Sequence, residues 1–352
     1  MTKQQNLIWD SGSAYDLFVS LWIIHRPDEF GLRPSWAAGV RSRLSIPFRD
    51  VLEHSQKFLY VPLPWIYSLP KPKNAMSALN ALEALRPEDR LSALTFGTQV
   101  DEGTTAYHKL LLSLDGKQRL SANIEAQLIE HYRSSNTPPK TFARAIFDAW
   151  SNREAFGNAF LKALNAYVLN FFQEEENRII PAQVRALENA QALAKEQDLL
   201  ALLEDLSAGV RMDWIAHRSK IILAPSFWGA PFVFFDILEE NAGILLFGAR
   251  PQGTTLVPGE LIPENLLNAL KALANPTRLR ILHYMQEGPC TPSELAKILR
   301  LRPPTVIHHL HILRLAGLVR VTVSPQSERR YALRSEGINA SIQHLQDFLP
   351  GA

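Results

Sequence analysis

Residues 275–323 read NPTRLRILHYMQEGPCTPSELAKILRLRPPTVIHHLHILRLAGLVRVTV, and this stretch decides the fold of the C-terminal part of the chain. Pro276 stands where the first turn of a helix begins, and Gly288 is the residue that would end that helix. Thr291 is followed three residues later by Glu294, which is the spacing of a capping box. The pattern therefore predicts one helix that ends before Gly288 and a short second helix that begins after Thr291.

The residues around these two helices complete a recognisable unit. ENLLNALKALAN (264–275) carries an apolar stripe that is typical of an amphipathic helix, and PPTVIHHLHILRLAGL (303–318) predicts a helix that ends at Gly317. LVRVTV (318–323) and RRYAL (329–333) alternate as two strands of a hairpin. Two helices across a short turn, followed by a β-hairpin, predict a winged helix-turn-helix.

The helix predicted at 303–316 has two different faces. Val306, Leu310 and Leu313 are spaced as a buried stripe that faces the core of the module. In this fold the N-terminal half of the second helix enters the major groove of DNA. The side chains left outward there are the predicted DNA-contacting residues, with His311 expected on another face: Arg302, Thr305, His308 and His309.

The predicted hairpin adds two more candidate DNA contacts, Arg329 and Arg330. Strand alternation turns one of them toward the DNA backbone or minor groove and the other away, and the pattern leaves open which is which. Arg278 and Arg280 are interpreted as charges on a helix surface, with phosphate contact as the alternative.

The segments NPTRLRIL, SELAKIL, TVIHHLHILRLAGLV and RRYAL resemble the ArsR-type winged-helix regulators over about 75 residues. The resemblance implies a homodimeric transcription factor that binds an inverted-repeat operator in double-stranded DNA, usually as a repressor that a ligand releases. The long region before the module resembles that of some larger bacterial ArsR-like regulators through the segment APSFWGAP (224–231).

Three departures from the family pattern affect this expectation. Metal-sensing members carry paired thiols at the start of the third helix, whereas this chain has CTPSELA with the single thiol of Cys290. Because soft metals need several such ligands, no metal site is predicted. Arg300 replaces a frequent glycine in the turn, and Pro303-Pro304 removes two N–H donors from the start of the recognition helix.

The first 250 residues predict mostly helices, followed by three short apolar strands. Pro181 is interpreted as the first-turn proline of a helix over 181–206, and the strands are SKIILAP (219–225), PFVFFDIL (231–238) and GILLFGA (243–249). The predicted fold class is mainly α with small β elements. Its parts are a helix-rich domain at 1–250, a linker at 251–263, a winged helix-turn-helix at 264–336 and a C-terminal helix at 337–352.

Charge separates the two parts of this 352-residue chain. Residues 264–352 hold 11 Lys and Arg against 6 Asp and Glu, while the rest holds 26 against 29, so the basic module suits a polyanion. One cysteine, the lack of a secretory pattern and the lack of a long apolar run predict a cytoplasmic protein without a membrane segment.

The first 250 residues contain no motif for catalysis or for a cofactor, which disfavours an enzyme with an appended regulatory module. Two hypotheses remain for this region. It senses an organic effector or a partner, through a pocket lined by its many aromatic residues, or it is only a scaffold for dimerisation or protein docking.

Overall fold

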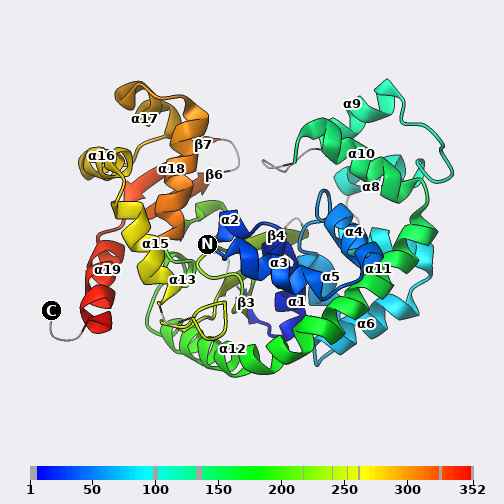
Figure 1. Cartoon of the computed structure of the whole chain (residues 1–352), viewed down its shortest axis with the longest axis horizontal. Helices are drawn as coiled ribbons and strands as arrows, with labels where there is room; N and C mark the ends of the chain where they lie inside the picture. The colour runs from blue at the N-terminus through cyan, green and yellow to red at the C-terminus, as the bar shows by residue number, and fades with distance from the viewer. Residues whose placement is uncertain are drawn as a thin grey trace.

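The computed structural model describes residues 6–97, 102–131, 137–216, 218–239, 241–251, 253–260, 262–324 and 327–349. The chain is mainly helical and has two small sheets, which confirms the predicted fold class. Figure 1 shows the C-terminal module at one end of the molecule and helices α8–α11 at the other.

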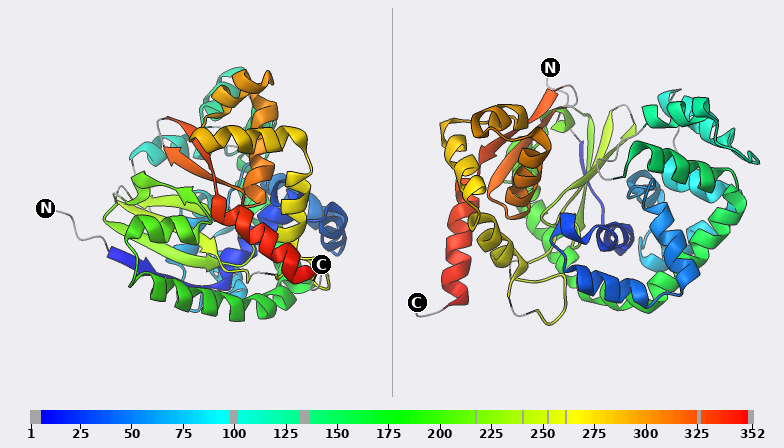
Figure 2. Two further views of the ribbon diagram at one scale, coloured as in Figure 1. Left: turned by 90° about the vertical axis from the view of Figure 1, so that its left-hand side faces the viewer. Right: turned by 45° about the horizontal axis from the view of Figure 1, so that its top comes forward.

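A four-stranded sheet lies between these two ends (Figure 2). The three predicted strands are present, and β1 joins them as an edge strand that the sequence had not indicated. β3 pairs in parallel with β1 and β5, whereas β4 is antiparallel to β5. In order across the sheet the strands are β1 (Asn6–Trp9), β3 (Lys220–Ser226), β5 (Ala242–Gly248) and β4 (Phe234–Glu239).

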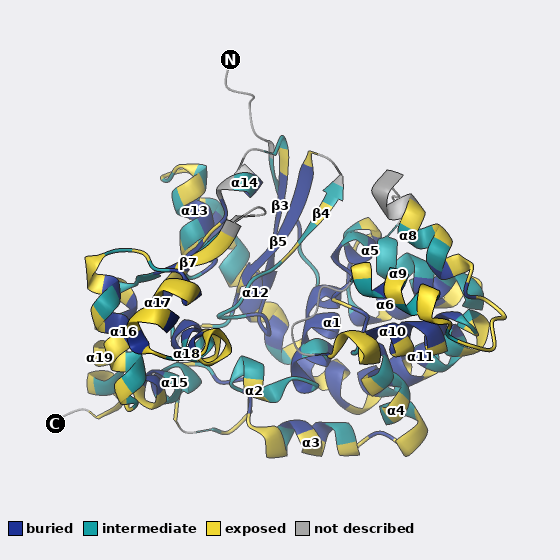
Figure 3. Cartoon of the chain, turned by 90° about the horizontal axis from the view of Figure 1, so that it is seen from above, coloured by how far each residue is buried: buried dark blue, intermediate teal, exposed yellow. Residues whose placement is uncertain are grey.

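Alternate residues of the central strands belong to two separate hydrophobic cores. Ile244 and Leu246 of β5 belong to the first core, and Leu245 and Phe247 belong to the second. Both faces of the sheet are therefore covered, as Figure 3 shows by the buried residues of β3 and β5. A strand that is buried on both faces needs apolar residues at nearly every position, which explains the uninterrupted runs in the sequence.

The first core is enclosed by helices from the N-terminal region, and its largest buried side chains include Trp150 and Trp228. A short 3₁₀ helix at Pro87–Asp89 joins the sixth and seventh helices. The helices are α1 (Ser13–Ile24), α2 (Pro27–Phe30), α3 (Pro34–Ser42), α4 (Ile46–Ser55), α5 (Leu63–Ser68), α6 (Ala75–Ala84), α7 (Arg90–Phe96), α8 (Glu102–Leu112), α9 (Ala122–Glu130), α10 (Pro139–Trp150) and α11 (Arg153–Tyr167).

The next helices differ from the prediction. A π-helical turn (Val168–Phe172) joins α11 to α12 (Gln173–Leu193), so the chain is continuously helical and Pro181 lies inside α12 rather than in a first turn. The helix does not break there because Ile179 and Ala182, on either side of the proline, are buried in the first core. The single helix predicted over 181–206 is two helices in the structure. α12 ends at Leu193, and α13 (Leu199–Leu206) begins after Asp198, whose side chain caps it.

The C-terminal module has the predicted winged helix. Its elements are α15 (Glu264–Leu273), α16 (Pro276–Tyr284), a 3₁₀ turn (Met285–Glu287), α17 (Pro292–Leu299), α18 (Pro303–Leu315), β6 (Val319–Ser324), β7 (Ser327–Leu333) and α19 (Ser335–Phe348). An unpredicted strand, β2 (Val210–Arg211), pairs in parallel with β6, and α14 (Asp213–Ala216) follows it. The sheet of the wing thus has a strand from the N-terminal region.

The predicted division at the linker 251–263 stays a prediction, and hydrophobic contacts connect the regions on its two sides. The second core contains Leu202 and Leu203 of α13 and Leu245 of the central sheet together with Leu310 and Leu313 of α18. In the predicted linker, the described residues form no helix or strand, yet Leu256 is buried. Its carbonyl oxygen accepts a hydrogen bond from Arg178 of α12.

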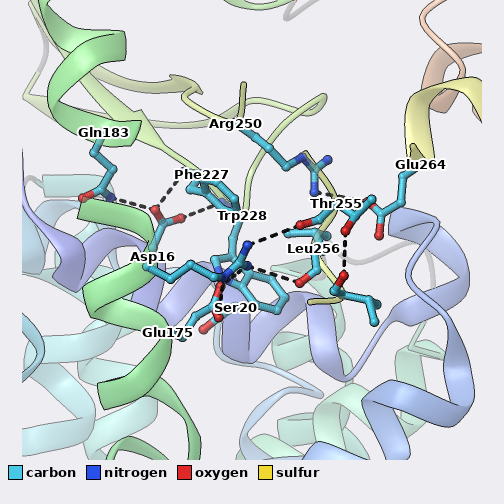
Figure 4. A network of polar contacts seen from close by, with 12 residues as sticks. Asp16, Ser20, Glu175, Gln183, Phe227, Trp228, Arg250, Thr255, Leu256 and Glu264 are labelled. Atoms are coloured by element: carbon cyan, nitrogen blue, oxygen red, sulfur yellow. Dashed lines mark hydrogen bonds and ion pairs between the residues drawn. The ribbon is translucent and has the colours of Figure 1, made fainter. Parts of the chain in front are cut away.

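A buried polar network connects α1, α12 and the loop after β3 (Figure 4). The carboxylate of Asp16 accepts hydrogen bonds from the side chains of Ser226 (2.6 Å) and Gln183 (2.7 Å) and from the amides of Phe227 and Trp228. Burial raises the pKa of Asp16 to about 6, although the four hydrogen bonds oppose that shift.

Candidate nucleic-acid interface

The turn between α17 and α18 is built by local interactions. The Thr291 hydroxyl accepts a hydrogen bond from the Glu294 amide, and the Glu294 carboxylate accepts one from the Thr291 amide, so the predicted capping box is present. Arg300 ends α17 with φ 54° and ψ 43°, the left-handed conformation that glycine would adopt without strain. The turn keeps its geometry despite the arginine, at a conformational cost of about 1 kcal/mol.

α18 presents the predicted face. Val306, Leu310 and Leu313 are fully buried, as the helical spacing predicted. Arg302 occupies the N-cap position of the helix, but its side chain makes no capping hydrogen bond. Pro303 and Pro304 begin the first turn of the helix. The first helical turns therefore offer side chains rather than backbone amides to a ligand.

The predicted contact residues on α18 differ in exposure. The side chains of Arg302, Thr305 and His308 are exposed on the outer face, whereas His309 is half-buried. Burial lowers the pKa of His309, and the nearby charges of Arg278 and His308 lower it further. His309 is therefore neutral at pH 7 and offers a hydrogen bond, not a charge.

The far end of α18 is attached to the N-terminal region. The ring of His311 lies 2.7 Å from the carbonyl oxygen of Glu29 in α2 and stacks on Phe232, so it lies on another face, as predicted. The buried guanidinium of Arg314 donates to the carbonyl oxygens of Ser207 and Ala208, both at 3.0 Å. The C-terminal half of this helix is thus fixed to the body of the protein.

The structure distinguishes the two arginines of the wing. Arg330 donates to the carbonyl oxygen of Pro289 at 2.8 Å and lies 3.9 Å from Glu294. Arg329 is exposed, and within the described residues no carboxylate lies within ion-pair distance of it. Arg329 is therefore the wing cation available to an external anion, while Arg330 holds β7 against the loop before α17.

Two cations near the turn were missed by the sequence interpretation. Lys297 of α17 and Arg300 at its end are exposed, and among the described residues neither has a carboxylate within ion-pair distance. They extend the positive surface that begins at Arg302. The helical spacing of Lys297 on the polar face of α17 was the available signal. Arg278, in contrast, donates to the carbonyl oxygens of Lys271 and Ala272 and so caps α15.

In the part of the chain that the structure describes, no group of three histidine, cysteine, aspartate or glutamate residues is arranged to hold a metal ion. Cys290 is half-buried, its thiol lies 3.4 Å from the carbonyl oxygen of Gly288, and burial raises its pKa. Within the same residues, none of the helices combines the length and apolar character needed to cross a bilayer.

Comparison with known proteins places the module among bacterial regulators. Residues 275–321 match the sequence model of the bacterial regulatory protein arsR family. The HTH-type transcriptional regulator CmtR of Mycobacterium tuberculosis is 40% identical over 75 residues, which are 21% of this chain and 63% of CmtR. The transcriptional repressor SdpR of Bacillus subtilis is 35% identical over 88 residues, which are 23% of this chain and 90% of SdpR.

A crystal structure of an ArsR family transcriptional regulator is also similar, with a TM-score of 0.22 and 32% identity over 24% of this chain and 90% of that one. The chain spans less than two thirds of the length of CmtR but nearly all of SdpR. The residues that match the family model run from the N-cap of α16 into β6, which is the core of the winged helix. The chain belongs to the ArsR family of bacterial regulatory proteins.

Proposed function

We propose that this protein represses transcription by binding an inverted repeat in double-stranded DNA as a homodimer. The observation that carries the proposal is the exposed row formed by Arg302 at the N-cap of α18 and by Thr305 and His308 on its first turns, beside a fully buried apolar face. An exposed polar row at the N-terminal end of a recognition helix is the part of this fold that meets base edges in the major groove.

The individual residues take different roles in this proposal. Thr305 and His308 contact base edges, and His309 contributes a neutral imidazole beside them. Lys297, Arg300 and Arg302 contact phosphates along one strand, and Arg329 contacts the backbone or minor groove from the wing. These phosphate contacts position the module, and the contacts of α18 give it sequence preference.

A second copy of the chain is the partner that we assign to α19. Apolar residues recur at helical spacing along this helix and at the residue that follows it: Ile338, Ile342, Leu345 and Leu349. Ile342 is 53% exposed and Leu349 is 49% exposed, so the stripe continues beyond the part that packs on the second core. An amphipathic helix with an uncovered stripe at the edge of the module suits an isologous contact with its own copy.

We assign a sensing role to the N-terminal region because it holds the recognition helix directly. The contacts of Glu29 with His311 and of Ser207 and Ala208 with Arg314 connect α2 and the end of α13 to α18. A change in the relative position of these elements would move the helix that reads DNA. A ligand acts through such contacts only when it favours one arrangement over the other.

The DNA-binding proposal is tested by fluorescence anisotropy with a fragment of the gene's own promoter, in a series of salt concentrations. Binding should weaken steeply as salt rises, because Lys and Arg side chains release condensed counterions when they bind DNA, and this release is less favourable at higher salt. Thr305→Ala and His308→Ala should each cost about 1–3 kcal/mol and reduce the preference for the operator over random DNA. Arg329→Ala should weaken binding to both DNAs equally. Arg185→Ala, on the exposed surface of α12, is the matched control.

The opposite results would refute the placement of the interface. Arg330→Ala is a further test of this placement. The guanidinium of Arg330 is already engaged with Pro289 and Glu294, so this variant should weaken operator binding less than Arg329→Ala does. Binding that is insensitive to salt, or unchanged by all the α18 variants, would contradict the proposal.

The dimer is tested by sedimentation velocity. Ile342→Asp places a charge in the uncovered stripe and should shift the protein toward monomer, and operator binding should weaken with it. Gln343→Asp changes an exposed neighbour on the polar face of α19 and should leave the dimer intact. A wild-type protein that sediments as a monomer at operator-binding concentrations would contradict this part of the proposal.

A further inference from the structure

A cavity of about 370 Å³ lies where the N-terminal region meets the winged helix. One side of it is formed by the end of α13, the turn at Ala230–Pro231 and the segment after β5. The other side is formed by α15, the last residues of α18 with the turn that follows, and the first half of α19. Its volume falls within the range of about 300–1,000 Å³ that is usual for small-molecule sites.

The lining combines apolar surface with unpaired polar groups. Phe30, Leu206, Pro231 and Leu315 supply apolar surface from four separate elements. Asn268 of α15 also lines the cavity, and within the described structure its side-chain amide makes no hydrogen bond. A largely apolar wall with a few converging polar groups is the usual form of a site for a small organic molecule.

The charges in the cavity favour an anion. The half-buried carboxylate in the lining, Glu264, already forms an ion pair with Arg250 at 3.3 Å (Figure 4). Backbone hydrogen bonds from Leu256 and Val257 also favour its charged form. The exposed Asp205 at the rim accepts a hydrogen bond from Gln197. The acidic groups are therefore engaged.

The basic groups are less fully paired. Arg334 reaches only the carbonyl oxygen of Gly317, at 3.5 Å, and none of the described carboxylates lies within ion-pair distance of it. Nη1 of Arg250 is buried and lies 3.3 Å from Glu264 without an aligned hydrogen bond, and its other terminal nitrogen donates to Ala230 at 2.6 Å. Behind the wall, Arg314 is held by carbonyl oxygens alone. A guanidinium that has only carbonyl oxygens as partners forms stronger, charge-assisted hydrogen bonds with an oxyanion.

We propose that this cavity binds a small organic anion, with its carboxylate or phosphate group at Arg334 and its apolar body against Phe30, Pro231 and Leu315. The proposal deepens the proposed function, on which it rests, by identifying this anion as the effector of the regulator. The site lies at the junction with the module rather than inside the aromatic core of the N-terminal region.

The position of the cavity explains how occupancy would reach DNA. Leu315 and Ala316 end the recognition helix, and they line the cavity together with Pro231, whose carbonyl oxygen lies 3.5 Å from Arg314. A ligand between these groups contacts the end of α18 and the N-terminal body at once. The bound state then favours one placement of α18, and operator affinity changes by the difference in ligand affinity between the two placements.

The test uses the full-length protein and three probes, benzoate, phenyl phosphate and benzamide, in saturation-transfer NMR titrations. Benzoate or phenyl phosphate should bind saturably and about tenfold more tightly than the neutral benzamide, because only the anions pair with a guanidinium. The comparison of benzoate with phenyl phosphate identifies which oxyanion the site prefers.

Variants locate the binding. Arg334→Met should weaken anion binding about tenfold, and Ala340→Phe, which fills the cavity from α19, should abolish it. Arg185→Met on the surface of α12 should have no effect. Thermal unfolding of each variant shows whether it is folded, and Asn268→Leu replaces either site variant that is not. Equal binding of benzoate and benzamide, no saturable binding by any probe, or binding that all three cavity variants leave unchanged would overturn the site.

Operator binding is measured in parallel with and without the probe that binds. The operator affinity of the wild type should change when the probe is present, and that of Ala340→Phe should not. A protein that binds the anion and the operator without any change in affinity would overturn the effector role. A protein that binds the anion but no DNA would instead overturn the proposed function and leave the site standing, so the two failures are distinguishable.

Discussion

The winged helix module and the N-terminal region differ in how far apart in the chain their stabilising contacts lie. In the module, Thr291 and Glu294 cap each other three residues apart, and Arg330 reaches Pro289 across 41 residues. In the N-terminal region, Asp16 accepts a hydrogen bond from Ser226, 210 residues away. The fold of the module is therefore specified mainly by local sequence pattern, while the larger region depends on contacts between distant segments.

The central sheet is where the two regions meet, and adjacent residues of β5 test whether they unfold together. Ile244 faces the first core and Leu245 faces the second. Ile244→Ala and Leu245→Ala should each lower the free energy of unfolding by about 2–5 kcal/mol, since each leaves a cavity in a packed core. Because one sheet supports both cores, each variant should still show a single transition in calorimetry and in tryptophan fluorescence.

The control for this pair is Ile237→Ala on β4, where the side chain is 47% exposed and its loss should change stability by less than about 1 kcal/mol. Two separate transitions in Leu245→Ala, with only the later one shared with the wild type, would show that the cores are independent. The chain would then unfold as two units divided at the predicted linker 251–263, despite the core contacts that cross it.

The second prediction concerns Asp16, whose contacts exist only when α1, α12 and the loop after β3 have assembled. Asp16→Asn should lower the free energy of unfolding by about 2–4 kcal/mol at pH 7. An amide has one oxygen for four converging donors, so buried donors lose their partners. Denaturant unfolding measures the change, with the exposed Asp148→Asn as control. A loss no greater than that of the control would mean that the network does not stabilise the fold.

The folding stability that Asp16 contributes should depend on pH with a sign opposite to that of most carboxylates. The pKa of Asp16 is raised to about 6 in the folded protein, so its protonated form is favoured by folding. Its contribution to stability is full below the unfolded pKa and is lost as pH rises through about 6. Between pH 7 and pH 5 the wild type should therefore gain about 1 kcal/mol relative to Asp16→Asn. An unchanged difference between the two proteins across this range would contradict the shift.

These contrasts explain what the sequence could and could not predict. The helices and hairpin of the module, and the buried row Val306, Leu310 and Leu313, follow from periodicity and caps within a few turns. β1 and β2 were missed because strands of four and two residues carry almost no periodic signal, and their pairing partners lie far along the chain. Pro181 was misplaced because packing on both sides of it outweighed its preference for a first turn.

The candidate interface shows the same limit at the level of side chains. Helical spacing correctly put Arg302, Thr305 and His308 on the surface, but it could not separate Arg329 from Arg330. That distinction depends on a carbonyl oxygen 41 residues away, at Pro289. The junction cavity was also beyond a sequence argument, because its lining comes from segments between Phe30 and His344.

The smallest expected effect concerns the turn of the module, where a local preference is violated. Arg300 adopts φ 54°, so Arg300→Gly should raise the free energy of unfolding by about 0.5 kcal/mol, the relief of strain being partly offset by the entropy of glycine in the unfolded chain. Arg300→Ala removes the same charge but keeps the strain, and it should be less stable than Arg300→Gly by up to about 1 kcal/mol. Both variants should weaken operator binding by the same amount, because both remove the phosphate contact that we propose for Arg300. Thermal unfolding and anisotropy separate these two consequences.

Equal stability of the two variants would show that the left-handed turn carries no strain. Unequal operator binding would show that the turn itself, rather than the charge, positions α18.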